Sequence, residues 1–193
     1  MLLDANVLYS RALRDWICLS ALRCADNMFR IRWSEDILSE WMYNYRRKNP
    51  HLSDQSVGGM RRRLEAAFPS AMVTGYAVDP QTSAVKDKND AHVHAAALAA
   101  GVDIVVSANV KDFSEDPDDL DYEVWTPDDF LCLVDDSSPS AVQKVLSEQL
   151  EYWRAKRPGS VPDLPLALED ANAAQFADRI RCHLKHFALN GLY

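Results

Sequence analysis

The chain has 193 residues, enough for one domain with a sizeable core and an appendage. Hydrophobic residues make up 48% of it without an excess of Pro or Gly, which excludes wholesale disorder, and a net charge of −8 argues against binding nucleic acid through overall charge. No apolar run reaches membrane-spanning length, and the N-terminus MLLDANVLYS lacks the basic region of a signal peptide. We therefore expect a cytoplasmic protein without a membrane partner.

The first 80 residues alternate short apolar segments with amphipathic ones. In chain order, the pattern predicts a strand at 1–3, a helix at 7–26, a strand at 29–33, helices at 34–49 and 51–70, and a strand at 71–79. Ser34 is a good N-cap and is followed by two acids that favour the start of a helix. Pro50 marks the end of that helix.

The same alternation continues to residue 135 and then stops. The pattern predicts a helix at 90–101, strands at 102–109 and 122–125, and a helix beginning near Asp128; two longer helices follow at 140–157 and 169–189, joined by a Pro-rich connection. The segment DDSSPS between these parts is typical of a linker. We predict an α/β domain with a central parallel sheet at 1–135 and a helical C-terminal extension at 136–193.

Cysteine and histidine offer no strong metal motif. None of the four cysteines forms a C-x-x-C pair, and we expect them to be reduced. His183 and His186 stand three residues apart on a predicted helix, a spacing that more often marks a solvated helix face than a metal site.

Acidic side chains are predicted to meet at one edge of the sheet. Asp4 follows the first strand, Asn109 and Asp112 lie at and beyond the end of the strand at 102–109, and Asp90 opens the helix before that strand. Glu40 lies on the second predicted helix. In a parallel α/β sheet, functional groups gather at the C-terminal ends of the strands. Converging carboxylates repel unless a cation separates them, and oxygen ligands suit Mg²⁺ or Mn²⁺.

Each of these residues also has a structural explanation. Asp4 and Asp90 are good caps for the helices that follow them, and Asn109 and Asp112 favour a turn. Glu40 is explained equally well as a surface acid on an amphipathic helix. The pattern alone leaves both interpretations open.

The residues resemble a known family in three separated blocks. LLDANVLYS, the helical Glu in SEDILSEW, and KNDAHVHAAALAAGVDIVVSANVKDF resemble the PIN-domain family over roughly residues 1–135. The resemblance implies a three-layer α/β/α fold and a ribonuclease that depends on Mg²⁺ or Mn²⁺; many bacterial members are VapC-type toxins. It places the family's most regular acids at Asp4, Glu40 and Asp90. The fourth acid of many members falls at Asn109, which can still offer a carbonyl oxygen to a metal.

The resemblance also implies supporting residues. Asp112 could supply the carboxylate that Asn109 lacks, and Asp87 is a further candidate. Ser107 matches the family's Ser or Thr and could bind a ligand or water, while Asn6 could orient Asp4.

Two basic clusters lie on the helices near Glu40 and are candidates for holding an RNA backbone. They comprise Arg46, Arg47, Lys48, Arg61, Arg62 and Arg63. Their simplest explanation is a solvated helix face. Tyr43 and Tyr45 could stack on unpaired bases. By resemblance, the partners are an RNA substrate, an antitoxin protein and a second copy in a homodimer.

The leading hypothesis is therefore a metal-dependent endoribonuclease, the toxin of a type II toxin–antitoxin pair, with Asp4, Glu40, Asp90 and Asp112 as catalytic acids. Water-driven cleavage would leave a 5′-phosphate and a 3′-hydroxyl. The alternative is a binding module that keeps the fold but has a metal site degraded at Asn109. A small-molecule phosphatase is a weaker hypothesis, because Asn6 stands where the second acid of its nucleophilic pair would be.

Overall fold

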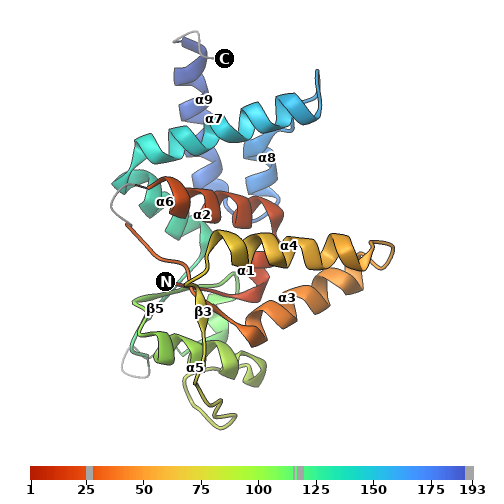
Figure 1. Ribbon diagram of the computed structural model, residues 1–193. Helices are drawn as coiled ribbons and strands as arrows, with labels where there is room; N and C mark the ends of the chain where they lie inside the picture. The colour runs from red at the N-terminus through yellow and green to blue at the C-terminus, as the bar shows by residue number, and fades with distance from the viewer. Residues whose placement is uncertain (25–27, 115, 117–119, 190–193) are drawn as a thin grey trace. The chain divides into compact units, whose positions relative to one another are not determined.

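A computed structural model describes residues 1–24, 28–114, 116 and 120–189 of the chain (Figure 1). The chain divides into two compact units, which we treat separately: unit 1 comprises 1–9 and 29–126, and unit 2 comprises 10–28 and 127–193. Within the described residues, none of the helices is long and apolar enough to cross a membrane. The domain boundary at residue 135 stays a prediction, since compactness alone does not define a folding domain.

Unit 1 is built around three parallel strands. Strand β4 (Ile104–Val106) lies in the middle, between β1 (Leu2–Leu3) and β5 (Glu123–Trp125). The register pairs Leu3 with Val106 and Val106 with Trp125, so these strands end side by side. Leu2 and Leu3 of β1 and Val105 and Val106 of β4 are buried, which explains why these two strands are continuous apolar runs rather than alternating ones. The predicted α/β fold with a central parallel sheet is thereby confirmed.

A second pair of parallel strands extends this sheet on the other side of β1. Strands β2 (Trp33–Ser34) and β3 (Met72–Val73) pair with each other, and a bridge between Leu2 and Arg32 joins them to β1. The spatial order is therefore β3-β2-β1-β4-β5, and the chain changes direction across the sheet at β1. Ligands bind open α/β sheets at such a switch point, beyond the C-terminal ends of the strands. Here the switch point lies between Asp4 and Ser107.

Helices of unit 1 connect these strands. They are α1 (Ala5–Tyr9), α3 (Glu35–Lys48), α4 (Asp54–Ala67) and α5 (Ala91–Ala100), with the short 3₁₀ helices η2 (Lys88–Asp90) and η3 (Val110–Asp112). The hydroxyl of Ser34 accepts the Ile37 N–H at 3.2 Å and caps α3 as predicted. Gly101 ends α5 in the left-handed conformation with φ 53°, which favours glycine.

The alanine-rich helix α5 is buried along most of its first two turns. Its small side chains allow it to lie against α3, β2 and β3, with Val93 and Ala96 inaccessible to solvent. This packing fixes the start of α5, and with it Asp90, beside α3 and Glu40. The alanines therefore position the acids as well as filling the core.

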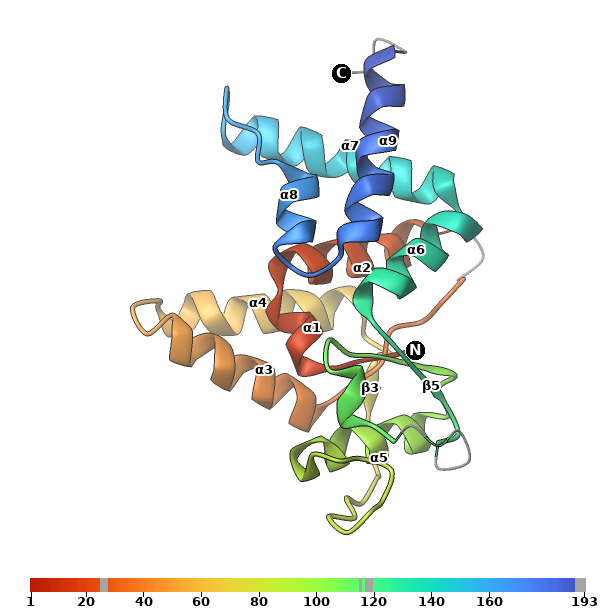
Figure 2. The ribbon, with the colours of Figure 1, turned by 180° about the vertical axis from the view of Figure 1, so that it is seen from behind.

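In the described residues of unit 2, the regular secondary structure is all helical. It combines α2 (Arg11–Arg23) with α6 (Pro127–Ser137), α7 (Pro139–Lys156), α8 (Leu164–Glu169) and α9 (Ala174–Leu189), as Figure 2 shows from behind. Trp16 of α2 and Phe176 of α9 pack edge to face with ring centroids 5.1 Å apart, and both are buried. The apolar stripes of the C-terminal helices are thus covered in part by a helix from the N-terminal region.

Four expectations about elements were wrong. The helix predicted at 7–26 is two helices, because Ser10 interrupts it and its hydroxyl caps α2; residues 25 and 26 lie outside the described residues. The strand predicted at 71–79 is only β3. The Pro-rich connection contains α8, capped by Asp163, and the last helix begins at 174 rather than 169. His183 is not on a solvated face, since its Nε2 lies 2.7 Å from Asp135.

Candidate active site

Asp4 stands at the end of β1 and is almost fully buried, with 3% of its surface exposed. Its Oδ1 accepts the N–H of Ala5 at 2.5 Å, and its Oδ2 accepts the Ser107 hydroxyl at 2.7 Å and the Asn6 amide at 2.6 Å. Burial raises the pKa of Asp4, and these donors oppose that rise. The carboxylate is therefore held in one orientation, and Asn6 contacts it directly.

The ends of β1 and β4 are joined by side chains. The Asn6 amide also donates to the Ser107 hydroxyl at 3.1 Å, and its carbonyl accepts the Ala108 N–H at 3.0 Å. Ser107 has no solvent exposure and accepts the Asn109 N–H at 3.1 Å. This network fixes the loop after β4 to the acid at the end of β1, so Ser107 and Asn6 both lie beside Asp4.

Glu40 of α3 faces the same place. Its side chain is 42% exposed, and its Oε1 accepts the Asn44 amide at 3.4 Å. Burial, followed by the negative charge of Asp4 and partly offset by His92, raises the pKa of Glu40. Glu40 is therefore not a surface acid remote from the others.

Asp90 does not cap α5. Although it occupies the N-cap position, its side chain makes no capping hydrogen bond within the described part of the chain. The cap of the preceding turn is Asp87, whose Oδ1 accepts the Asn89 N–H at 2.9 Å. The carboxylate of Asp90 is thus available for another role.

The pKa of Asp90 depends on its burial and on the acids around it. Burial, followed by the charges of Asp4, Asp87, Asp112 and Glu40, raises this pKa from 3.8 to about 7. All five carboxylates predicted for the site are therefore close enough for their charges to interact. A shift of this size, caused by burial and by a cluster of like charges, is typical of functional sites.

Asn109 and Asp112 lie on the loop after β4. Asn109 is exposed and precedes η3, and Asp112 ends that 3₁₀ turn. The carbonyl of Asp112 accepts the Lys86 N–H at 2.6 Å, which ties this turn to the loop before η2. Only Asp112 of the two adds a negative charge near Asp90.

His92 was missed in the sequence although it lies among these acids. Its Nδ1 lies 2.6 Å from the Asn89 carbonyl, so Nδ1 carries the proton when the ring is neutral. Its Nε2 then faces Glu40 Oε2 at 3.5 Å and has no hydrogen-bond partner among the described residues. No local sequence pattern indicates that His92 lies near Glu40, which the fold brings opposite it.

Each of the two basic clusters contains one arginine that is already in an ion pair. Arg46 binds Asp54, and Arg61 binds both Glu35 and Glu65. The other four are exposed: Arg47, Lys48, Arg62 and Arg63. Arg47 lies over the exposed ring of Tyr43 at 5.9 Å, and Lys48 lies over the ring of Tyr9 at 5.0 Å. Contact with RNA stays a prediction for both clusters.

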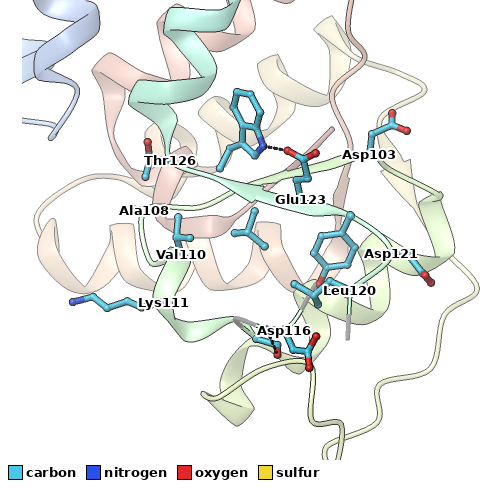
Figure 3. Close-up of a pocket in the computed structure, with 13 residues that line it drawn as sticks. Asp103, Ala108, Val110, Lys111, Asp116, Leu120, Asp121, Glu123 and Thr126 are labelled. Carbon is cyan, nitrogen blue, oxygen red and sulfur yellow. Dashed lines mark hydrogen bonds between the residues drawn. The ribbon is translucent and has the colours of Figure 1, made fainter. Parts of the chain in front are cut away.

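An open groove along the edge strand β5 is a separate feature (Figure 3). It is lined by the loop after β4 and by β5 itself, where the Trp125 indole donates to Glu123 at 2.6 Å. Asp4, Glu40 and Asp90 do not line it. The groove is therefore not the candidate active site.

The carboxylates fit a divalent cation by their chemistry. Within the described residues, no three His, Cys, Asp or Glu side chains already stand in a metal-binding arrangement. Burial and, after it, the negative charges of neighbouring acids nevertheless raise the pKa values of Glu40 and Asp90. A hard cation with oxygen ligands would relieve that repulsion.

Comparison with known families agrees with this geometry. A family model described as the PIN domain matches residues 1–111, and one described as the VapC50 C-terminal domain matches residues 127–182. No curated protein and no solved structure shows a significant match. PIN domains are typically nucleases that use divalent metal ions. The first match covers more than half of the chain, and the chain therefore belongs to the PIN-domain family, in its VapC-type branch.

Proposed function

We propose that this protein is a metal-dependent endoribonuclease that hydrolyses phosphodiester bonds of RNA. The observation that carries the proposal is the convergence on Asp90 of negative charge from Asp4, Asp87, Asp112 and Glu40. Acids this close together repel one another when they are ionised, and a bound cation would compensate that repulsion. Family membership gives the reaction class.

The residues proposed to hold Mg²⁺ or Mn²⁺ are Asp4, Glu40, Asp90 and Asp112. Such an ion, when bound, lowers the pKa of water and offsets the charge that develops on a phosphoryl group. Asp4 is already oriented before any ligand binds, because its carboxylate accepts hydrogen bonds from three donors. Ser107 and Asn6 are positioning residues that act through Asp4.

We assign the fourth acidic position to Asp112 rather than to Asn109. Asp112 is among the acids whose charge raises the pKa of Asp90, whereas Asn109 brings no charge. Asn109 instead continues the Ser107 network through its backbone N–H. Its amide oxygen could still contact a water of the ion.

RNA is proposed to approach along α3. Residues three, four and seven positions apart share one side of a helix, so Glu40, Tyr43, Asn44 and Arg47 form one row. Tyr43 is 66% exposed and offers a ring for an unpaired base, beside a guanidinium that suits phosphate. This row leads from the carboxylates to the exposed end of the helix.

The biological role follows from the branch of the family. We propose that the protein is the toxin of a type II toxin–antitoxin pair, that a cognate antitoxin protein binds it, and that it acts in the cytoplasm as a homodimer. The family matches support the toxin and its antitoxin, while dimerisation and location rest on analogy alone.

The test is cleavage of total cellular RNA by the purified protein. We expect cleavage with Mn²⁺, none with EDTA, and a loss of at least 100-fold in Asp90→Asn, since one metal ligand is removed. Asp121→Asn is the matched control: it makes the same change at an exposed acid before β5 and should keep full activity. Cleavage that survived in Asp90→Asn would contradict the assignment.

The alternative is a PIN fold that binds RNA or a protein without cleaving. Two observations favour it: Asn109 replaces a family acid, and no ready-made metal site stands among the described residues. Measuring Mn²⁺ binding and RNA cleavage at millimolar Mn²⁺ separates the nuclease from the binding module. A degraded site would neither bind the ion nor support cleavage.

A further inference from the structure

Unit 2 carries a cluster of cationic and aromatic side chains, most of them near the C-terminal end of α7. Three cationic side chains surround the half-buried ring of Trp153. The Arg11 guanidinium carbon lies 4.6 Å from the ring centroid, that of Arg157 5.5 Å, and the Lys156 ammonium 5.7 Å. Arg11 comes from α2, so two helices build the cluster.

Tyr152 extends the cluster into solvent. Its ring is nearly perpendicular to that of Trp153, with centroids 5.2 Å apart, and the residue is 47% exposed. The Lys156 ammonium donates to its hydroxyl at 2.8 Å and lies 5.2 Å from its ring centroid. Lys156 and Arg11 both lower the pKa of Tyr152, which shows that positive charge is concentrated around this hydroxyl.

Nearby acids do not neutralise the cluster. Asp15 lies 3.2 Å from Arg11 and 3.9 Å from Arg14, so one carboxylate serves two guanidinium groups. Glu148, one turn before Tyr152, is already paired with Arg23 at 2.6 Å. Glu151 lies about 200° around the helix from Trp153, because successive residues are about 100° apart. A positive area therefore persists on a chain whose net charge is −8.

From this composition we infer that the cluster of Arg11, Tyr152, Trp153, Lys156 and Arg157 is a binding surface for single-stranded RNA. Cations beside exposed rings are what single strands require: ammonium and guanidinium groups hold phosphates while the rings stack on unpaired bases. An acidic protein segment would use the cations but would gain little from the rings. A base-paired helix is disfavoured because its bases are not free to stack on Tyr152.

This inference does not depend on the proposed nuclease activity. The surface belongs to unit 2, whereas the carboxylates belong to unit 1, so binding here is measurable even if the protein cleaves nothing. Because EDTA prevents metal-dependent cleavage, binding and catalysis are separated in the same experiment.

The test is fluorescence anisotropy of a labelled oligouridylate, which forms no base pairs, titrated with the full chain in EDTA. Three variants are compared: Lys156→Gln, Tyr152→Leu and the control Lys144→Gln. Lys144 is exposed on the same helix, twelve residues earlier and thus about 18 Å along its axis. All three side chains are exposed, so the variants should fold, which circular dichroism verifies.

We expect Lys156→Gln and Tyr152→Leu each to raise the Kd about fivefold or more, and Lys144→Gln to change it by less than about twofold. Lys156→Gln should also reduce the slope of log Kd against log salt by about 0.7, the value for one phosphate contact on a single strand. An unchanged Kd in Tyr152→Leu, or equal weakening by Lys144→Gln, would overturn the inference. Displacement of the RNA by oligoglutamate at equal concentration would do so too, since it would indicate an acidic protein partner.

Discussion

The hydroxyl of Ser107 donates to Asp4 Oδ2 at 2.7 Å although 103 residues separate the two in the chain. The bond spans the ends of β1 and β4, where the strand order reverses. Both residues are buried, and Asp4 is the acid with most hydrogen-bond donors in the candidate site. The orientation of Asp4 is therefore built into the fold rather than left to the ligand.

Replacing Ser107 with Ala should cost about 1–3 kcal/mol of unfolding free energy, because a buried carboxylate loses a donor. Affinity for Mn²⁺ should fall by about 10- to 100-fold, as for other residues that orient a ligand. Chemical denaturation and calorimetric titration measure the two effects.

Ser20→Ala provides the matched control. Ser20 is equally buried, but its hydroxyl finds no hydrogen-bond partner in the part of the chain that the structure describes. Its removal should not lower the unfolding free energy, because a buried hydroxyl without a partner contributes no hydrogen bond. Equal costs for the two substitutions would show that the Ser107 bond contributes nothing of its own.

Stability without metal should depend on pH through Asp90. Its pKa of about 7 in the folded protein lies above its value in the unfolded chain, so the folded state holds this proton more tightly. The resulting stabilisation is complete below about pH 4 and is lost as pH rises through 7. Asp4 and Glu40, whose pKa values are also raised, act in the same direction.

Asp90→Asn should remove the contribution of this group. In EDTA we expect the variant to match the parent near pH 4 and to be more stable by about 1–2 kcal/mol at pH 8, after allowing for solvent screening of a half-exposed carboxylate. Thermal unfolding at several pH values measures the difference. A variant less stable than the parent at pH 8 would mean that Asp90 makes a favourable structural contact instead.

Substitutions of His92 can distinguish the role of its Nδ1 from the role of its Nε2. Its Nδ1 contacts the Asn89 carbonyl, and its Nε2 faces Glu40. An Asn side chain reaches about as far as Nδ1, and a Gln side chain about as far as Nε2. If His92 positions Glu40, His92→Gln should keep most of the RNA cleavage that His92→Ala loses, while His92→Asn should not. Rescue by Asn alone would assign His92 to the turn at Asn89.

Asp128 should be the most important helix cap in unit 2. It is buried and accepts the N–H groups of Gln175 at 3.0 Å and Phe176 at 2.8 Å, so it caps α9 from another helix. Asp128→Ala should cost about 2–3 kcal/mol because two backbone donors at the start of α9, one of them buried, lose their partner. Asp163→Ala, which removes the exposed local cap of α8, should cost about 1 kcal/mol. Urea denaturation compares them, and a larger cost at Asp163 would contradict this ranking.

The sequence predicted what depends on local pattern. Ser34 and Gly101 mark helix ends by their own chemistry, and buried parallel strands appear as apolar runs, so most elements of unit 1 were found. The acids were also expected together, because strand ends meet at one edge of a parallel sheet.

Features that depend on tertiary contacts were not predictable. Asp128 looks like the start of its own helix, and nothing local indicates that it caps α9, 47 residues later. Similarly, α2 has no sequence signal that assigns it to the C-terminal helices. His92 was overlooked because a histidine on an apolar helix is usually a core residue, and only the fold brings Glu40 opposite it.

Calorimetric titration of the metal-free protein with Mn²⁺ at pH 7 tests directly whether the carboxylates form a metal site. We expect Mn²⁺ to bind with release of part of a proton, because Asp90, with a pKa of about 7, is half protonated at this pH and must ionise to bind a metal. Binding should be lost in Asp90→Asn and kept in Asp121→Asn. Binding of equal strength in Asp90→Asn, or no binding to the parent at millimolar Mn²⁺, would contradict a metal site at these carboxylates.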